Sequence, residues 1–284
     1  MVVFTSCEVE YVIEQKDFVP QVVVNSVFTE NKPFQVHLSF TRDIFQRDKE
    51  IKIIPDAKVT VTEKATGRTA ALEHQGEGVY TFAFFTAKSD HTYELKVLVD
   101  GYKPINAVSR VPLKVRNVNV ITESIVLDEK EALQIKFNIQ DYNSAYFIWN
   151  WIASNQKNPI DSSVFSAPDK FVQDVNKVRN LNLKSDDNTN LGFKDDGNEY
   201  IRSFVYSNDD TGSQGSGSQT ENDKYYLRIM SLSKEMYDFY SSFEKYINDN
   251  NQISSISYLP KVYSNVENGL GIFAGYSQKY IEVR

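Results

Sequence analysis

Hydrophobic and polar residues alternate from Phe18 to about Lys114. The clearest runs place apolar residues at every second position: Val36, Leu38 and Phe40; Ala57, Val59 and Val61; Tyr93, Leu95, Val97 and Val99. Successive side chains of a strand point to opposite faces, so each run predicts a strand with one buried face. Turn residues separate the runs, and no helical stripe interrupts them. The pattern therefore predicts an immunoglobulin-like β-sandwich over residues 18–116.

A second antiparallel β domain is predicted for residues 117–284, so the fold class is mainly β. Alternation returns over residues 133–139, and residues 224–230 form another candidate strand. Residues 146–152 are apolar at both alternating sets of positions. A strand of that composition is central in a sheet or covered by another element.

One helix is predicted near residues 232–248 of this second domain. Met236, Tyr240, Phe243 and Ile247 follow one another at spacings of four, three and four, which places them on one helical face. A serine at 231 or 233 can cap the first turn, because its hydroxyl accepts a hydrogen bond from a free backbone N–H. We expect the aromatic face of the helix to pack on the sheet.

The two tryptophans of the chain, Trp149 and Trp151, lie in the apolar segment 146–152. Core packing is the simpler interpretation of both side chains. Because they share a face of the predicted strand, they are also the candidate ligand-binding residues, as an aromatic platform for a sugar or a peptide.

Long acidic loops are predicted between residues 155 and 222. The stretch from 185 to 224 has nine acidic residues against three basic ones. Residues 186–190 look like the start of a calcium loop, but the glycine and the later acid that such a loop needs are missing. We therefore predict solvated loops and no metal site.

Gly269, Gly271 and Ala274 match the dinucleotide fingerprint G-x-G-x-x-A. That fingerprint needs a strand, a helix and a later acid, and too few residues follow for such a unit. We reject nucleotide binding and expect these glycines to permit a close backbone approach or a bend in a late hairpin.

Charge and composition exclude several classes of protein. The 284 residues carry a net charge of −7, which gives no basic field for nucleic acid. One Cys and three His exclude an internal disulfide and a Cys-rich zinc site. No apolar run reaches the roughly 20 residues of a membrane-spanning helix. We predict no cofactor.

The single cysteine, Cys7, follows Phe4-Thr5-Ser6, and this arrangement resembles a bacterial lipobox in which the Cys becomes lipidated. Acidic residues follow it at positions 8, 10, 14 and 17. Residues 1–17 are thus predicted to be a lipobox remnant and an acidic tether, with Cys7 as the lipidation site. An incidental thiol in a short tail is the alternative.

Residues 265–277 read Asn-Val-Glu-Asn-Gly-Leu-Gly-Ile-Phe-Ala-Gly-Tyr-Ser, preceded by Tyr-Leu-Pro at 258–260. This ending closely resembles that of a Bacteroidota lipoprotein family, catalogued as domain of unknown function 4249. Weaker similarities occur in the family's order at six further segments: 4–7, 21–28, 100–102, 111–112, 193–197 and 231–233. The resemblance covers nearly the whole chain.

The resemblance implies a surface-exposed outer-membrane lipoprotein that serves as the accessory binding subunit of a TonB-dependent nutrient transporter. It implies no catalytic residues. A free-standing adhesin that binds glycan or protein is the alternative function. A hydrolase is disfavoured, because no G-x-S-x-G motif occurs and Cys7 lies in a tail; we predict that the protein is not an enzyme.

Overall fold

The computed structural model describes residues 18–43, 50–127, 130–139, 146–154, 191–193, 200–207, 224–250 and 261–282. Within them the single helix is α2 (Lys234–Asn250). The strands are β1 (Val22–Thr29), β2 (Pro33–Phe40), β3 (Lys58–Glu63), β4 (Thr69–His74), β5 (Val79–Thr86), β6 (Thr92–Leu98), β7 (Ile105–Arg110), β8 (Val118–Leu127), β9 (Lys130–Ile139), β10 (Tyr146–Ser154), β11 (Leu191–Phe193), β12 (Tyr200–Ser207), β13 (Lys224–Leu232) and β14 (Leu270–Glu282).

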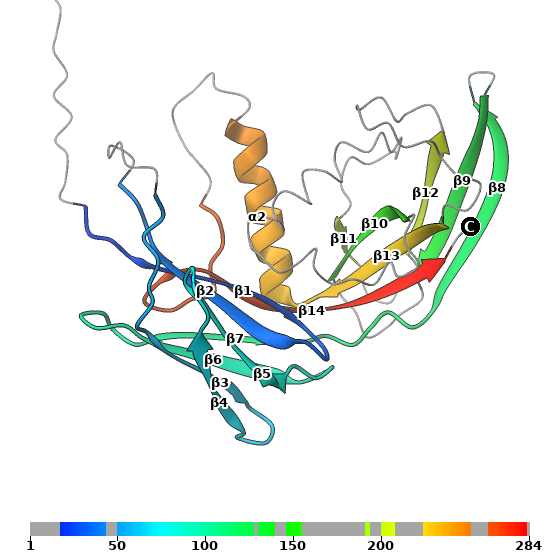
Figure 1. Cartoon of the computed structure of the whole chain (residues 1–284). Coiled ribbons are helices and arrows are strands. Elements are labelled where there is room, and N and C mark those ends of the chain that lie inside the picture. Colours follow the sequence, from blue (N-terminus) through cyan, green and yellow to red (C-terminus); the bar gives the residue numbers. More distant parts are fainter. Residues whose placement is uncertain are drawn as a thin grey trace, which may run out of the picture.

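Two sheets contain all of these strands. The larger is a curled, mixed sheet in the order β11-β10-β13-β14-β1-β2-β5-β4-β3-β6-β7, and the smaller has the order β12-β9-β8. The small sheet rises at one end of the molecule, and β3 to β7 lie at the other (Figure 1). The mainly β class with one packed helix is confirmed. The immunoglobulin-like arrangement of residues 18–116 stays a prediction, because these strands continue into a larger sheet.

The main hydrophobic core lies where the large sheet curls over itself. Its strands alternate buried and open positions as the sequence predicts, so Phe34, Val36 and Leu38 of β2 are all fully buried. The curl brings β7 against β14, where the Gly275 amide donates a hydrogen bond of 3.2 Å to Ser109 Oγ. Phe273 of β14 enters this core, and the centre of its ring lies 4.6 Å from that of Phe28.

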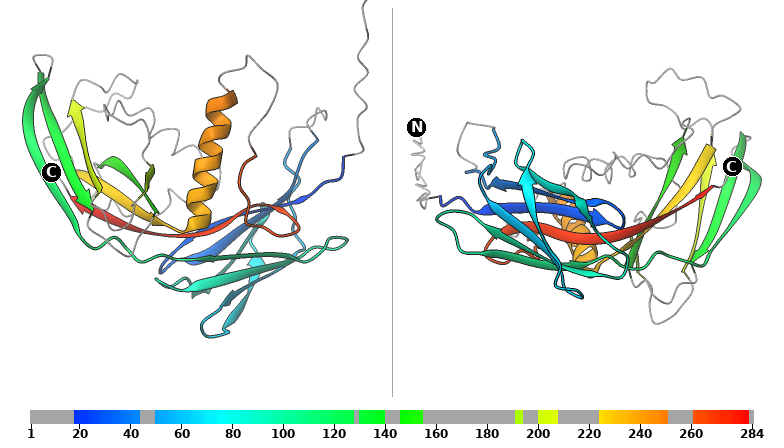
Figure 2. Two further views of the ribbon diagram at one scale, coloured as in Figure 1. Left: turned by 180° about the vertical axis from the view of Figure 1, so that it is seen from behind. Right: turned by 60° about the horizontal axis from the view of Figure 1, so that its bottom comes forward.

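Strand β14 joins the two predicted domains. It pairs parallel with β1 along Val23–Thr29 and antiparallel with β13 along its later half. The long red strand runs through both parts of the molecule in each view of Figure 2. Parallel neighbours need a long crossover connection, and nearly the whole chain supplies it here. Residues 270–282 therefore belong to the second domain in sequence and partly to the first core in packing.

The helix stands on the concave face of the large sheet, above β13 and β14 (Figure 1). Ser233 begins it as predicted, because Ser233 Oγ accepts a 3.3 Å hydrogen bond from the Met236 amide. Met236 and Tyr240 are buried against Met230, Leu232 and Ile272 of the sheet. In the part of the chain that the structure describes, no helix combines the length and the apolarity that crossing a membrane requires.

Candidate functional site

Strand β5 contains a large bulge at its pairing with β2. Thr81 pairs with Gln35 and Thr86 with Pro33, so residues 82–85 stand opposite the single residue 34. The bulge reverses the alternation, because Tyr80 points into the core before it and Phe85 points into the core after it. Bulges of this kind re-aim side chains next to functional sites.

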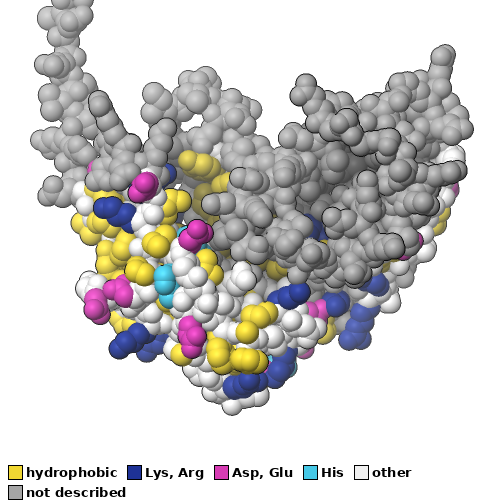
Figure 3. Space-filling view, in the orientation of Figure 1, with side chains coloured by type: hydrophobic (Ala, Val, Ile, Leu, Met, Phe, Trp, Pro, Cys, Tyr) yellow, Lys and Arg dark blue, Asp and Glu magenta, His cyan; other side chains and the backbone are white. Residues whose placement is uncertain are grey.

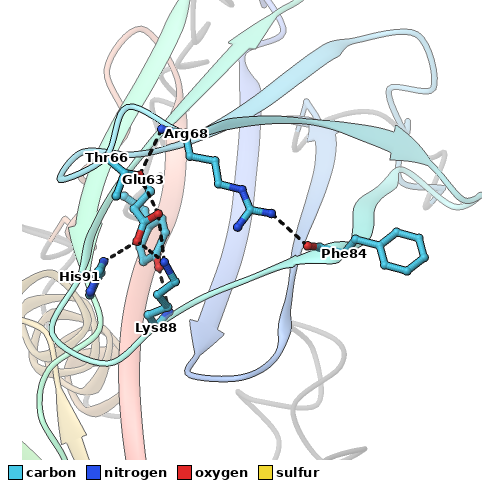
Figure 4. A network of polar contacts seen from close by, with 7 residues as sticks. Glu63, Thr66, Arg68, Phe84, Lys88 and His91 are labelled. Atoms are coloured by element: carbon cyan, nitrogen blue, oxygen red, sulfur yellow. Dashed lines mark hydrogen bonds and ion pairs between the residues drawn. The ribbon is translucent and has the colours of Figure 1, made fainter.

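Phe84 is the residue that the bulge exposes. Its side chain is 81% exposed, more than any other large hydrophobic side chain that the structure describes. It points away from the domain, whereas its carbonyl points back toward Arg68 (Figure 4). A phenylalanine gains about 1.5–3 kcal/mol when a partner buries it, so this position is a candidate contact.

Arg68, the residue just before β4, supports the bulge from the side. Its Nη2 donates a long hydrogen bond of 3.5 Å to the Phe84 carbonyl. Its guanidinium lies 5.1 Å from the centre of the Phe85 ring, a distance at which a cation is attracted to an aromatic face. Arg68 itself is exposed, so an aromatic surface and a cation are presented side by side.

A buried carboxylate fixes the two loops that flank this surface. Glu63 is 2% exposed and accepts hydrogen bonds from Thr66 Oγ1 at 2.8 Å and from Lys88 Nζ at 3.0 Å. His91 Nδ1 is in close contact with the same carboxylate. Thr66 belongs to the β3–β4 turn and Lys88 and His91 to the β5–β6 loop, so one side chain ties both together (Figure 4).

The Glu63 carboxylate is held in its charged form. Burial alone would raise its pKa, but the hydrogen bonds from Thr66, Lys88 and His91, with the charge of Lys88, outweigh burial and leave the pKa below its ordinary value. The ionised carboxylate is therefore the form that the fold prefers.

The stability of the fold should consequently decrease when the pH is lowered and Glu63 becomes protonated. Because the folded pKa is depressed, this contribution is fully present above the unfolded pKa of about 4.5 and is lost as pH falls through the folded value. We expect Glu63→Gln to lower the free energy of unfolding at pH 7 by about 1–3 kcal/mol. The variant should also lose stability less steeply than the parent between pH 6 and pH 3.

Urea denaturation at several pH values measures both effects. Glu94→Gln is the matched control, because Glu94 is paired with Lys64 at 3.8 Å and its side chain is 43% exposed. An exposed pair contributes little, so the control should follow the parent. A Glu63→Gln profile parallel to that of the parent would contradict this role for the carboxylate.

The bulge and its supports are suited to binding. Phe84 offers apolar area, and Arg68 offers donors to a carbonyl or carboxylate of a partner. The described ranges, from residue 18 to residue 282 with their gaps, hold no group of three or more His, Cys, Asp or Glu placed for a metal ion.

The structure leaves the residues selected from the sequence untested. Cys7 lies outside the described residues, as do most of the acidic loops. Trp149 and Trp151 lie in β10, in register with Ile229 and Leu227 of β13. Their side chains are also outside the description, so the aromatic platform stays a prediction.

Sequence reasoning missed Glu63, Arg68 and Phe84, although two signals were present. Glu63 continues the inward positions of Val59 and Val61, so strict alternation already places a carboxylate in the core. The bulge is foreshadowed by Phe-Ala-Phe-Phe at 82–85, where the period of two breaks. The structure also brings His91 of the β5–β6 loop into contact with the Glu63 carboxylate.

Comparisons with known proteins identify the family. One solved structure that matches is a candidate carbohydrate-binding protein from Bacteroides uniformis ATCC 8492. It is 11% identical, the match covers 92% of this chain and 98% of that one, and the TM-score is 0.20. The comparison with curated proteins finds no significant match. A family model described as domain of unknown function (DUF4249) matches residues 8–282, and the chain therefore belongs to the DUF4249 family.

Proposed function

We propose that this protein is a surface-exposed outer-membrane lipoprotein, anchored through Cys7, that binds a TonB-dependent nutrient transporter as its accessory subunit and catalyses no reaction. The observation that carries the binding role is Phe84, a large apolar side chain held 81% exposed. The bulge and the Glu63 contacts fix its surroundings before any partner arrives. A preorganised contact loses little conformational entropy on binding, which favours affinity.

The anchor is supported by the lipobox-like residues before Cys7 and by membership of the family. Phe18, the first described residue, follows Cys7 by eleven positions. An extended chain of that length spans at most about 40 Å. A body on such a short tether stays beside the membrane, within reach of the part of a transporter that stands above the lipid.

Acylation is tested with the full gene in its native host. Mass spectrometry of the N-terminal peptide should find lipid on Cys7, and Cys7→Ser should move the protein out of the membrane fraction. Ser6→Gly is the matched control, because it keeps a small residue before the cysteine and should leave the protein anchored. An unmodified thiol in the full-length product would contradict the proposed anchor.

The partner is tested by affinity recovery from solubilised outer membranes. The parent protein should recover a transporter barrel, and Phe84→Ser should reduce that recovery at least about tenfold, the equivalent of 1.4 kcal/mol. Leu98→Ser is the control, since Leu98 is an exposed apolar side chain outside the bulge. Recovery without any barrel, together with specific signals on a glycan array, would favour the adhesin instead.

A further inference from the structure

A second group of exposed apolar side chains lies where the chain enters the fold. Its members are Phe18 (40% exposed), Val19 (73%), Ile51 (52%) and Ile53 (40%), and we call them the tether-root patch. On the side of the molecule where β1 begins, hydrophobic side chains gather on the surface (left in Figure 3). Isolated exposed apolar residues are ordinary, whereas a group of them marks an interaction site.

Backbone hydrogen bonds bring the two halves of the patch together. The Thr41 amide donates to the Gln21 carbonyl at 2.9 Å, and the Phe40 amide donates to the Lys52 carbonyl at 2.9 Å. The end of β2 thus lies between the segment that contains Val19 and the segment that contains Ile51. Ile53 forms a bridge with Ser39 one step further along β2.

The Ile51 and Ile53 side of the patch is held in place by the core. Ile54 is 1% exposed, and its carbonyl accepts a 2.6 Å hydrogen bond from the buried Tyr80 hydroxyl. The Ile54 amide donates a hydrogen bond of 3.1 Å to the Leu38 carbonyl. With Ile54 fixed in the core, neighbouring Ile53 is directed to the outside, as the alternation of a strand requires.

We propose that the tether-root patch rests on the lipid surface that carries the anchor. The proposal depends on the proposed function in one respect, the lipid on Cys7. The tether of eleven residues ends at Phe18, so the patch surrounds the point at which the anchored chain enters the fold. Apolar side chains at an interface gain free energy by entering the headgroup region.

This contact would also orient the domain. The patch lies at the end of β2 that pairs with the start of β1, at Phe40 and Val22. The bulge lies at the other end, where Pro33 pairs with Thr86. A strand rises about 3.3 Å per residue, so roughly 23 Å of β2 separates the two surfaces. With the patch on the lipid, Phe84 lies near the end of β2 that is farther from the membrane.

The experiment couples the whole 284-residue chain, through its single Cys7, to phosphatidylcholine vesicles that carry a maleimide lipid. Amide hydrogen exchange is then compared with that of protein coupled to a water-soluble maleimide. We expect exchange at residues 50–54 to slow about tenfold on the vesicles, and exchange around Phe84 to stay unchanged. The double variant Ile51→Ser, Ile53→Ser should lose the protection.

Leu98→Ser, Val108→Ser is the matched control, because both side chains are 40% exposed outside the patch, and it should keep the protection. Equal exchange on vesicles and in solution would overturn the proposal. So would protection that appears only with transporter-containing membranes, since the occupant would then be a protein. Because the coupling is chemical, the result is independent of acylation in the host, whose failure would contradict the proposed function instead.

Discussion

Replacing Gly271 by alanine is expected to destabilise the fold severely. A Cβ built on Gly271 would lie 1.9 Å from the Val24 carbonyl oxygen of β1, and the neighbouring obstacles are also backbone atoms. Gly271 has φ of +107°, a conformation that costs other residues about 1–3 kcal/mol. Relieving the clash requires β1 and β14 to separate, and such overpacking costs about 1–3 kcal/mol more.

Together, the cost of the positive φ and the cost of the clash approach half of the 5–15 kcal/mol that stabilises a typical domain. Equilibrium denaturation in urea, followed by circular dichroism, should show a midpoint far below that of the parent or no folded baseline. Gly101→Ala is the matched control, because Gly101 also has positive φ, +82°, but nothing lies within 4 Å of its Cβ position. Gly101→Ala should lose only the part of the free energy of unfolding that comes from the positive φ. Equal losses in both variants would contradict the close approach of β14 to β1.

Gly271 and the elements around it show which features of the fold can be predicted from the sequence. Period-two alternation predicted β2, β3 and β6, because each buries one face. The helix was predictable because Met236 and Tyr240 repeat at helical spacing and Ser233 caps the first turn. The sequence predicted that the glycines at 269 and 271 allow a close backbone approach or a bend in a late hairpin, and the structure shows the close approach. Its partner, Val24, could not be named, because alternation reports which face of a strand is buried and not which strand lies beside it.

The same limit applies to the candidate site. Glu63 continues an inward series, but the donors that make its burial tolerable come from Lys88 and His91, about 25 residues further along the chain. Nothing local marks those two residues as its partners. Phe84 is exposed because four residues of β5 face one residue of β2. That count is a property of the pairing between two strands and cannot be read from either strand alone.

Replacing Phe273 by alanine is expected to weaken both parts of the molecule together. Phe273 is fully buried and its ring lies 4.6 Å from that of Phe28 and 6.3 Å from that of Phe34. Removing a buried aromatic ring costs about 3–5 kcal/mol. Phe84→Ala removes the same atoms from an exposed position, so its effect on the free energy of unfolding should stay within about 0.5 kcal/mol.

Amide hydrogen exchange in low urea tests this prediction. The exchange rates of β1 and β2 and those of α2 are measured separately in the parent, in Phe273→Ala and in Phe84→Ala. The Ser233 amide, at the start of α2, donates a hydrogen bond of 3.0 Å to the Gly275 carbonyl of β14. Phe273, two residues earlier in β14, fills the core beneath β1 and β2. If β14 couples the two regions, Phe273→Ala must accelerate exchange in both by the same factor. Faster exchange in β1–β2 with α2 unaffected would mean that the helix region is stabilised independently of the core, and β14 would then connect two separate folding units.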